Sequence, residues 1–344
     1  MTLKIGIAAV PVTKEGIEYV VEAERLGVDS VWVPEFWGYD ALTPIGALAF
    51  ATDTIKLGTG IVQLGSRTPA MLAMSAMSLQ TMSEGRFRLG IGASGPQVVE
   101  GWHGVRFGKP VQRTRETIDI IRIATSGERL AYDGDTYQLP LPDSEGRAIR
   151  AAAPPVDVPV YVASLGPANL RLTGELTEGW IGNTFFPETA DVYFDQIAAG
   201  AALSVKTLGD IDLTVAASVE FTDDFEEAAQ RHASGYAFTI GAMGSGKTNF
   251  YNEAFTRNGF GEDVIDVERL WRGGDKEAAQ ARVPAAIGSG TNLLGNDAQI
   301  TERLRLHKNA GVNTIRANPQ GDTMQERLDC LGRLLDLVAT VNES

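Results

Sequence analysis

Leu3-Lys4-Ile5-Gly6-Ile7-Ala8-Ala9-Val10-Pro11-Val12, close to the start of the chain, is the stretch that separates two candidate folds. Its first eight residues are mostly apolar and predict a short buried β-strand. An open doubly wound sheet would carry a glycine fingerprint directly after this strand, and Ala9-Val10-Pro11-Val12 contains no glycine. The opening therefore favours a closed α/β barrel, with the open Rossmann-like sheet as the competing fold.

Outward from this strand, short apolar runs alternate with segments of helical period. The apolar runs show little alternation of apolar and polar residues, which is typical of parallel strands buried on both faces. Eight such units in order predict a single (β/α)8 TIM barrel of class α/β over residues 1–344. The predicted strands are 3–10, 30–34, 55–62, 87–91, 158–163, 179–182, 213–221 and 314–317. The predicted helices are 14–26, 43–52, 69–83, 111–125, one from Pro167, 189–203, 223–240, 298–310 and 323–341.

Two segments interrupt the regular alternation. Residues 127–155, after the fourth strand, are rich in Pro, Gly and Asp and predict an excursion from the barrel. Residues 241–297, after the seventh strand, predict a long insertion that shapes or covers a substrate pocket.

Composition limits the partners. The formal net charge of −14 disfavours nucleic acid and anionic membrane surfaces, although a few local amides and arginines can still bind an anionic cofactor. The start of the chain has no signal-peptide pattern, and no apolar run is long enough to span a membrane. The single cysteine, Cys330, lies in a helical pattern and is expected to be a buried core residue. A cytoplasmic protein is expected.

In a barrel of this kind the chemistry lies where the strands end. The second strand is followed by Pro34-Glu35-Phe36-Trp37-Gly38-Tyr39-Asp40, which predicts either an aromatic pocket wall with polar groups or a loop in which Asp40 caps the next helix. Gly58 and Gly60 inside the third strand indicate a bulge or a close backbone approach. Arg67 either pairs with an anionic group or is solvated.

The fourth and fifth strands end in small residues. Leu89-Gly90-Ile91-Gly92-Ala93-Ser94-Gly95-Pro96-Gln97 would let a flat ring lie against the backbone, although its GxGxxG-like spacing is a weak signal. His103 follows beside a tryptophan and is a candidate for proton transfer or for a structural role. Ala163-Ser164-Leu165-Gly166-Pro167-Ala168-Asn169 leads into a helix whose first amides can bind phosphate, or it is a plain βα turn.

One motif points elsewhere. Gly241 to Thr248 satisfies the P-loop pattern GxxxxGK[ST], and residues 236–240 can be read as the strand before it. The later chain offers no apolar strand ending in Asp to hold Mg²⁺, so we interpret the match as coincidence. The histidines His103, His232 and His307 are far apart in sequence, so no metal site is expected.

The strand-end residues resemble the luciferase-like family, and most closely its branch related to methylenetetrahydromethanopterin reductase, which uses the deazaflavin coenzyme F420. The resemblance rests on RFRLGIGASGPQVVEGWHG from Arg86 to Gly104, EFWGYDA from Glu35, LGTGI from Leu57, Arg67-Thr68-Pro69, and SLGP from Ser164. These segments span most of the chain in the family's order. Relatives that depend on FMN share the barrel and several of these turns.

The resemblance implies the site. In the family a cis peptide in a bulge of the third strand props the cofactor ring, and here it maps to Gly60-Ile61. Relatives often place a histidine after the acidic residue at Glu35, but this chain has Phe36 there, so Glu35, Tyr39 and His103 are the candidate proton donors. The implied cofactor contacts are Gly60, Ile61, Ala93, Ser94, Gly95, Ala163, Ser164, Gly166 and Pro167.

The function that follows is hydride transfer between coenzyme F420 and a small organic substrate, in a chain expected to form a homodimer. Three alternatives remain open. They are an FMN-dependent monooxygenase, a barrel that binds a cofactor without catalysis, and an enzyme that uses ATP through Gly241–Thr248.

Overall fold

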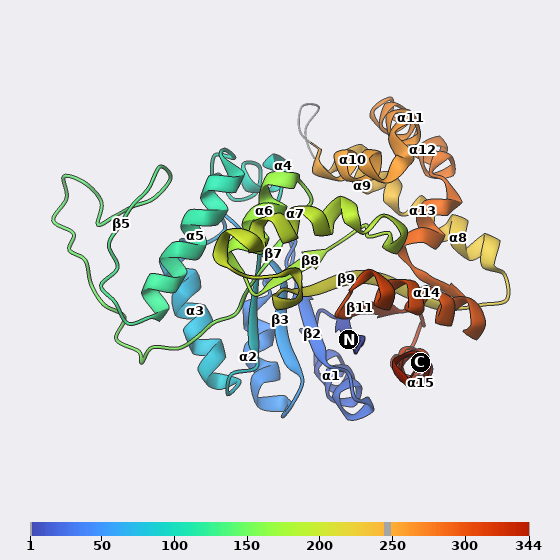
Figure 1. The fold of residues 1–344 in the computed structure, drawn as a ribbon, viewed down its shortest axis with the longest axis horizontal. Coiled ribbons are helices and arrows are strands. Elements are labelled where there is room, and N and C mark those ends of the chain that lie inside the picture. Colours follow the sequence, from blue (N-terminus) through green and yellow to red (C-terminus); the bar gives the residue numbers. More distant parts are fainter. Residues whose placement is uncertain (1, 244–248, 344) are drawn as a thin grey trace.

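Eight parallel strands close into a barrel in the computed structural model, which describes residues 2–243 and 249–343. The ring closes because β11 pairs with both β1 and β9, and β9 pairs with β8. The predicted (β/α)8 TIM barrel is confirmed (Figure 1). Its strands are β1 (Lys4–Ala8), β2 (Ser30–Pro34), β3 (Lys56–Gln63), β4 (Phe87–Gly92), β7 (Val160–Ala163), β8 (Gly179–Gly182), β9 (Asp212–Phe221) and β11 (Thr314–Pro319).

Helices cover the outside of the barrel, and several begin and end where local signals predict. Thr13 and Thr68 each cap a helix by accepting a hydrogen bond from a backbone N–H three residues on, and Pro69 occupies a first helical position. Gly27 ends its helix in the left-handed conformation. The outer helices are α1 (Lys14–Leu26), α2 (Leu42–Ala51), α3 (Pro69–Met82), α5 (Pro110–Thr125), α6 (Pro167–Leu176), α7 (Asp191–Ala201), α14 (Asp297–Ala310) and α15 (Met324–Glu343).

The predicted excursion over residues 127–155 is a long loop that stands away from the barrel in Figure 1. It contains the short hairpin of β5 (Tyr132–Asp133) and β6 (Gln138–Leu139). The buried Glu116 carboxylate on α5 accepts hydrogen bonds from three consecutive N–H groups of the hairpin turn, residues 135–137. One side chain therefore ties the turn to the barrel helix.

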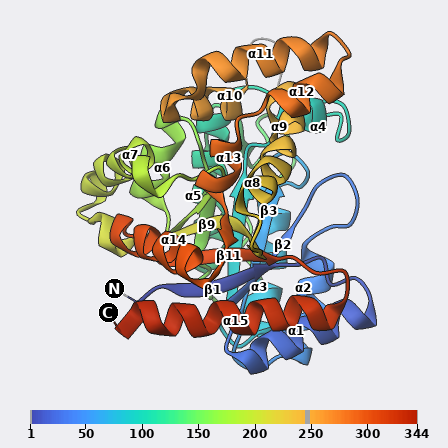
Figure 2. The ribbon, with the colours of Figure 1, turned by 90° about the vertical axis from the view of Figure 1, so that its right-hand side faces the viewer.

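The insertion after β9 is a bundle of short helices around a second apolar cluster, to which Phe186 from the segment after β8 also belongs. The helix predicted over 223–240 is wrong as one helix, because two helices meet at Gly235, a poor helix former. Figure 2 shows α10, α11 and α12 together at one end of the molecule. The helices are α8 (Phe225–Ser234), α9 (Tyr236–Ala242), α10 (Phe250–Phe255), the π-helical turn η4 (Thr256–Phe260), α11 (Gly261–Arg272), α12 (Lys276–Arg282) and α13 (Ala285–Thr291).

A ninth strand in the main sheet was not predicted. β10 (Leu293–Gly295) pairs with the last residues of β9, beyond the part of β9 that pairs with β8. Its three residues are too few to carry a strand pattern, and a capping box at Asn296 starts α14 directly afterwards. The insertion thus ends on the barrel rim before α14 begins.

Two other expectations need correction. The predicted helix 189–203 is shorter, because α7 is flanked by the 3₁₀ turns η1 (Pro187–Thr189) and η2 (Ala202–Ser204). Cys330, expected to be a buried core residue, is only partly buried, because α15 packs it against the core without enclosing it, and burial still raises the pKa of the thiol. No helix within the described ranges is long and apolar enough to cross a membrane.

Candidate active site

A cavity of about 520 Å³ opens at the carboxyl ends of the barrel strands, where parallel α/β barrels place their sites. Its wall comes from the loops after β2, β3, β4, β7 and β8, with insertion residues such as Phe238 and Tyr251 on the far side. The structure brings all nine predicted cofactor residues to this one wall. They are Gly60, Ile61, Ala93, Ser94, Gly95, Ala163, Ser164, Gly166 and Pro167.

A bulge in β3 shapes the floor of the cavity. The pairing of β3 with β2 shifts at Gly60, and its pairing with β4 is interrupted between Gly58 and Val62. The Thr59 hydroxyl fills the gap, since it donates to the carbonyl of Gly90 and accepts from the N–H of Gly90, both at 2.7 Å. A buried side chain therefore replaces the missing ladder hydrogen bonds.

The cis peptide that the family resemblance maps to Gly60-Ile61 is not found in this structure. Among the described residues the only cis peptide precedes Pro140, so Gly60-Ile61 is trans. The extra residue of the bulge already turns the strand, and a non-proline cis bond would cost about 2.5–4 kcal/mol more. A Cβ on Gly60 would lie 3.0 Å from the backbone nitrogen of Pro34, so the strands approach closely here.

The turn after β4 presents backbone rather than side chains. Ser94 has a φ of +58°, a left-handed conformation that side chains rarely adopt and that often marks functional turns. A Cβ on Gly92 would come within 3.1 Å of the Ile61 side chain. Small residues therefore keep this side of the cavity flat, as a planar ring would require.

The start of α6 faces the same cavity. Gly166 is the N-cap and offers no side chain, so the amides of Ala168 and Asn169 lack acceptors within the helix. Asn169 also carries a buried Oδ1 that has no hydrogen-bond partner among the described residues. The free N–H groups lie at the positive end of the helix dipole, so they suit a phosphate, whereas the Asn169 Oδ1 is an acceptor and suits a hydroxyl or N–H donor.

Ser164 is less available than expected. The Thr173 hydroxyl donates to the carbonyl of Asn169, so Ser164 must donate its own proton to Thr173, at 2.9 Å. Its carbonyl accepts from the Trp180 indole at 2.9 Å. The side chain thus anchors the turn to α6, and the backbone of the turn is what faces the cavity.

Glu35 is the one predicted proton donor that lines the cavity, and both its oxygens are occupied. Arg67 binds it through two parallel hydrogen bonds of 2.8 and 2.9 Å, and the N–H of Ala41 adds a third. Of the two alternatives for Arg67, pairing with an anionic group is therefore the one that the structure shows. Asp40 accepts from the N–H of Thr43 in the first turn of α2 at 2.8 Å, although the N-cap position itself is Ala41. The Glu35 carboxylate is therefore an acceptor that holds the loop after β2 in place.

His103 and Tyr39 lie outside both cavities at the barrel mouth. Gln63 donates to the carbonyls of Glu35 and Phe36, so its Oε1 faces His103 and accepts from Nε2 at 3.0 Å. Tyr39 is 67% exposed. The network joins the loops after β2, β3 and β4, and a catalytic role for either residue stays a prediction.

Comparison with known proteins bears on this geometry. A family model described as luciferase-like monooxygenase matches residues 4–314. The chain belongs to the luciferase-like monooxygenase family. It is 34% identical to a Mycobacterium tuberculosis protein named "Putative coenzyme F420-dependent oxidoreductase Rv3520c", over 91% of this chain and 93% of that protein. It is 29% identical to 5,10-methylenetetrahydromethanopterin reductase of Archaeoglobus fulgidus, over 96% and 98% of the two chains.

The fold has a close counterpart of known structure. The coenzyme F420-dependent tetrahydromethanopterin reductase of Methanopyrus kandleri superposes with a TM-score of 0.78 at 22% identity, over 96% of this chain and 98% of that chain. The family resemblance expected from the strand-end motifs is confirmed.

This luciferase-like chain has a second cavity, of about 940 Å³, that continues from the first. It lies over the ends of β1, β9 and β11, and Asn183 and Tyr251 line both cavities. Burial raises the pKa of the Tyr251 phenol and keeps it protonated. Arg316, in the middle of β11, lines this cavity. It was not singled out from the sequence, although a charged residue inside a buried strand indicates a functional or paired group.

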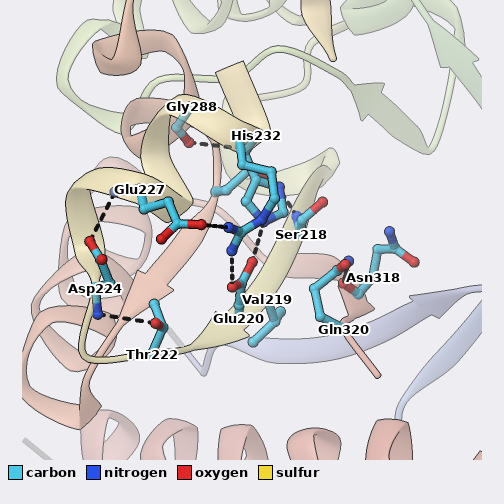
Figure 3. A network of polar contacts seen from close by, with 12 residues as sticks. Ser218, Val219, Glu220, Thr222, Asp224, Glu227, His232, Gly288, Asn318 and Gln320 are labelled. Atoms are coloured by element: carbon cyan, nitrogen blue, oxygen red, sulfur yellow. Dashed lines mark hydrogen bonds and ion pairs between the residues drawn. The ribbon is translucent and has the colours of Figure 1, made fainter. Parts of the chain in front are cut away.

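Polar contacts fix the rim beside this second cavity (Figure 3). Glu220, at the end of β9, contacts His232 of α8 at 2.8 Å and also pairs with Arg231. These bonds hold the first insertion helix against the barrel. No group of three or more His, Cys, Asp or Glu side chains in the described part of the chain could hold a metal ion.

The P-loop match lacks the context that its chemistry needs. Residues 236–240, which could be read as the preceding strand, belong to α9. A Cβ on Gly241 would collide with the Trp271 side chain, so this glycine serves helix packing. Gly244 to Thr248 lie outside the described residues.

Proposed function

We propose that this protein is an oxidoreductase that binds coenzyme F420 in the 520 Å³ cavity and moves a hydride between the deazaflavin and a small organic substrate. The observation that carries the proposal is the convergence of nine residues from three distant loops on the lining of one cavity. The Mycobacterium tuberculosis relative, whose match covers 91% of the chain, is named as a coenzyme F420-dependent oxidoreductase, which supports F420 as the cofactor.

The residues present fit this cofactor. The backbone of Ala93, Ser94 and the β3 bulge offers a surface without bulky side chains, on which a planar ring can lie. The free N–H groups at the start of α6 can donate to its phosphate, and the unpartnered Oδ1 of Asn169 can accept from a hydroxyl or N–H of its tail. When bound, the deazaflavin supplies the hydride chemistry, and the protein supplies binding and orientation.

The chain's own residues would hold the ring and exclude water. Phe238 and Tyr251 of the insertion close the side of the cavity opposite the strand ends. Glu35, through Arg67, keeps the aromatic loop after β2 in place. Glu35, Tyr39 and His103 stay candidate proton donors, and the geometry favours a supporting role for the first and third.

A fluorescence titration of the purified protein with F420, run beside FMN and ATP at equal concentrations, tests the proposal. Saturable binding of F420 alone at micromolar or lower concentration is the expected result. Preference for FMN, followed by oxygen consumption with reduced FMN, would instead place the protein among the flavin monooxygenases. Binding of ATP alone would overturn both readings and make Lys247→Ala the next variant.

Turnover separates an enzyme from a barrel that only binds. We expect the absorbance of F420 to fall, or that of reduced F420 to recover, with at least one substrate of a panel of small alcohols, aldehydes, enones and acids. Tight F420 binding with no turnover on any of them would favour a non-catalytic carrier.

We also propose that the protein acts as a homodimer in the cytoplasm. Neighbouring outer helices α2 and α3 expose the large apolar side chains of Phe50, Met71 and Met74, which supports a self-association surface. Light scattering at micromolar concentration would measure the mass, and a monomer would contradict the proposal.

A further inference from the structure

Arg316 is a buried cation without a counter-ion. Its side chain is on β11, and the residue is 5% exposed. Its guanidinium donates from Nη2 to the carbonyl of Gly182 at 2.9 Å and to Oδ1 of Asn183 at 3.0 Å. Its Nε has no partner, and no carboxylate of the described residues forms an ion pair with it. The undescribed residues contain no acidic side chain.

The position of this arginine is internal to the barrel. β11 and β8 are not neighbours, because β9 lies between them in the sheet. The hydrogen bonds from Arg316 to the end of β8 therefore cross the barrel interior rather than running along its surface. Burial lowers the pKa of Arg316 to about 10, so the group still carries its charge at neutral pH.

A buried, unpaired charge is expensive, and proteins normally supply a partner. Two other arginines of this chain follow that rule, since Arg67 pairs with Glu35 and Arg303 with Glu188. The surroundings of Arg316 are neutral, with Ser218, Asn292 and Asn318 also lining the second cavity.

The rest of the second cavity also carries positive charge. Arg327 lines its outer part, lies 5.2 Å over the Tyr19 ring, and leaves its own buried Nε unpaired. The one acidic lining residue of this cavity, Glu15, is exposed. On a chain with a net charge of −14, two unpaired arginines in one cavity indicate a ligand that brings negative charge.

We propose that the second cavity binds the substrate, and that the substrate carries a carboxylate or phosphate group which the Arg316 guanidinium holds. The planar fork of arginine donors matches either anion with two parallel hydrogen bonds. Asn183 lines both cavities and bonds to Arg316, so it joins the anion site to the wall on which the cofactor ring would lie. The assignment to substrate rests on the proposed function, whereas anion binding by Arg316 does not.

The first test measures anions without cofactor. Thermal unfolding of the whole protein is followed with increasing inorganic phosphate, acetate or succinate, against chloride at equal ionic strength. We expect saturable stabilisation of the wild type. Stabilisation by phosphate but not by acetate or succinate would assign a phosphate group, and the reverse would assign a carboxylate. Arg316→Met should lose at least four-fifths of the saturable stabilisation, because no other buried cation replaces the guanidinium.

The melting temperature without anion separates a ligand site from a structural arginine. Removal of an uncompensated buried charge offsets the loss of the hydrogen bonds to Gly182 and Asn183, so Arg316→Met should melt at about the wild-type temperature in chloride. Arg86→Met is the matched control, because Arg86 donates four hydrogen bonds to the 49–55 segment. That variant should melt lower and keep its response to anions.

Two results would overturn the inference. One is an anion response that Arg316→Met retains, or a wild type that shows no saturable response. The other is a tenfold or greater loss of F420 affinity in Arg316→Met, because the arginine would then bind the cofactor's own phosphate or tail. Failure of F420 to bind the wild type, with the anion response of Arg316 intact, would refute the proposed function and leave the anion site standing.

Discussion

The Thr59 hydroxyl holds the cavity floor by itself. Because it bonds to both backbone groups of Gly90, Thr59→Val would leave a buried donor and a buried acceptor unsatisfied. We expect a loss of about 2–4 kcal/mol in the free energy of unfolding, measured in urea. Thr59→Ser keeps the oxygen and should lose less than half as much. Equal losses in both variants would mean that the methyl packing, and not the hydroxyl, matters here.

Glu35 offers a second test at the same scale. Glu35→Gln turns an amide donor toward the Arg67 guanidinium and removes a carboxylate held by three hydrogen bonds. We expect destabilisation of about 1–3 kcal/mol in urea, with F420 affinity reduced only as far as the loop moves. Glu175→Gln, at the more exposed pair with Arg115, should change stability by less than about 1 kcal/mol. Unchanged stability with lost turnover would restore Glu35 as the proton donor.

At the level of elements, the start of α6 can be tested by charge. A Cβ on Gly166 would meet open space, and its backbone angles suit an N-cap. Gly166→Asp and Gly166→Asn should both cap α6 and raise stability by a few tenths of a kcal/mol. Only the aspartate puts a negative charge where a phosphate is expected, so it should weaken F420 binding at least tenfold more than asparagine does. Equal F420 affinities of the two variants in titration would show that the phosphate does not bind at the start of α6.

Strand and helix positions were predictable wherever one segment carries its own signal. The caps at Thr13 and Thr68 and the buried strands of the barrel are such cases. The break at Gly235 and the three-residue strand β10 were not predicted. Both depend on where the insertion meets the barrel rim, which no local pattern encodes.

For the molecule as a whole, pH dependence follows from His307. This histidine is buried on α14, and burial lowers its pKa from 6.5 to about 4. The unfolded chain binds the proton first, so the stability from this group is complete above pH 6.5 and is lost as the pH falls toward 4. The loss by pH 5 should be about 2 kcal/mol.

Urea unfolding at pH 7.5 and pH 5.0 measures this loss. His307→Asn keeps a donor near the position of Nδ1, which faces the carbonyl of Arg303, and removes the titration. The variant should lose about 2 kcal/mol less than the wild type between the two pH values. An equal loss in both proteins would assign the acid sensitivity to other groups.

The (β/α)8 barrel, the family and the nine residues of one cavity wall could be inferred from the chain read in order. They follow from short-range signals: apolar period, caps, glycines, and loops that a barrel must bring to one end. The partners of polar side chains could not be inferred, because Glu35 and Arg67, or His103 and Gln63, meet only when separate loops fold together. The sequence could not predict that Arg316 is a buried cation without a carboxylate partner, because this depends on the side chains of every strand that surrounds it.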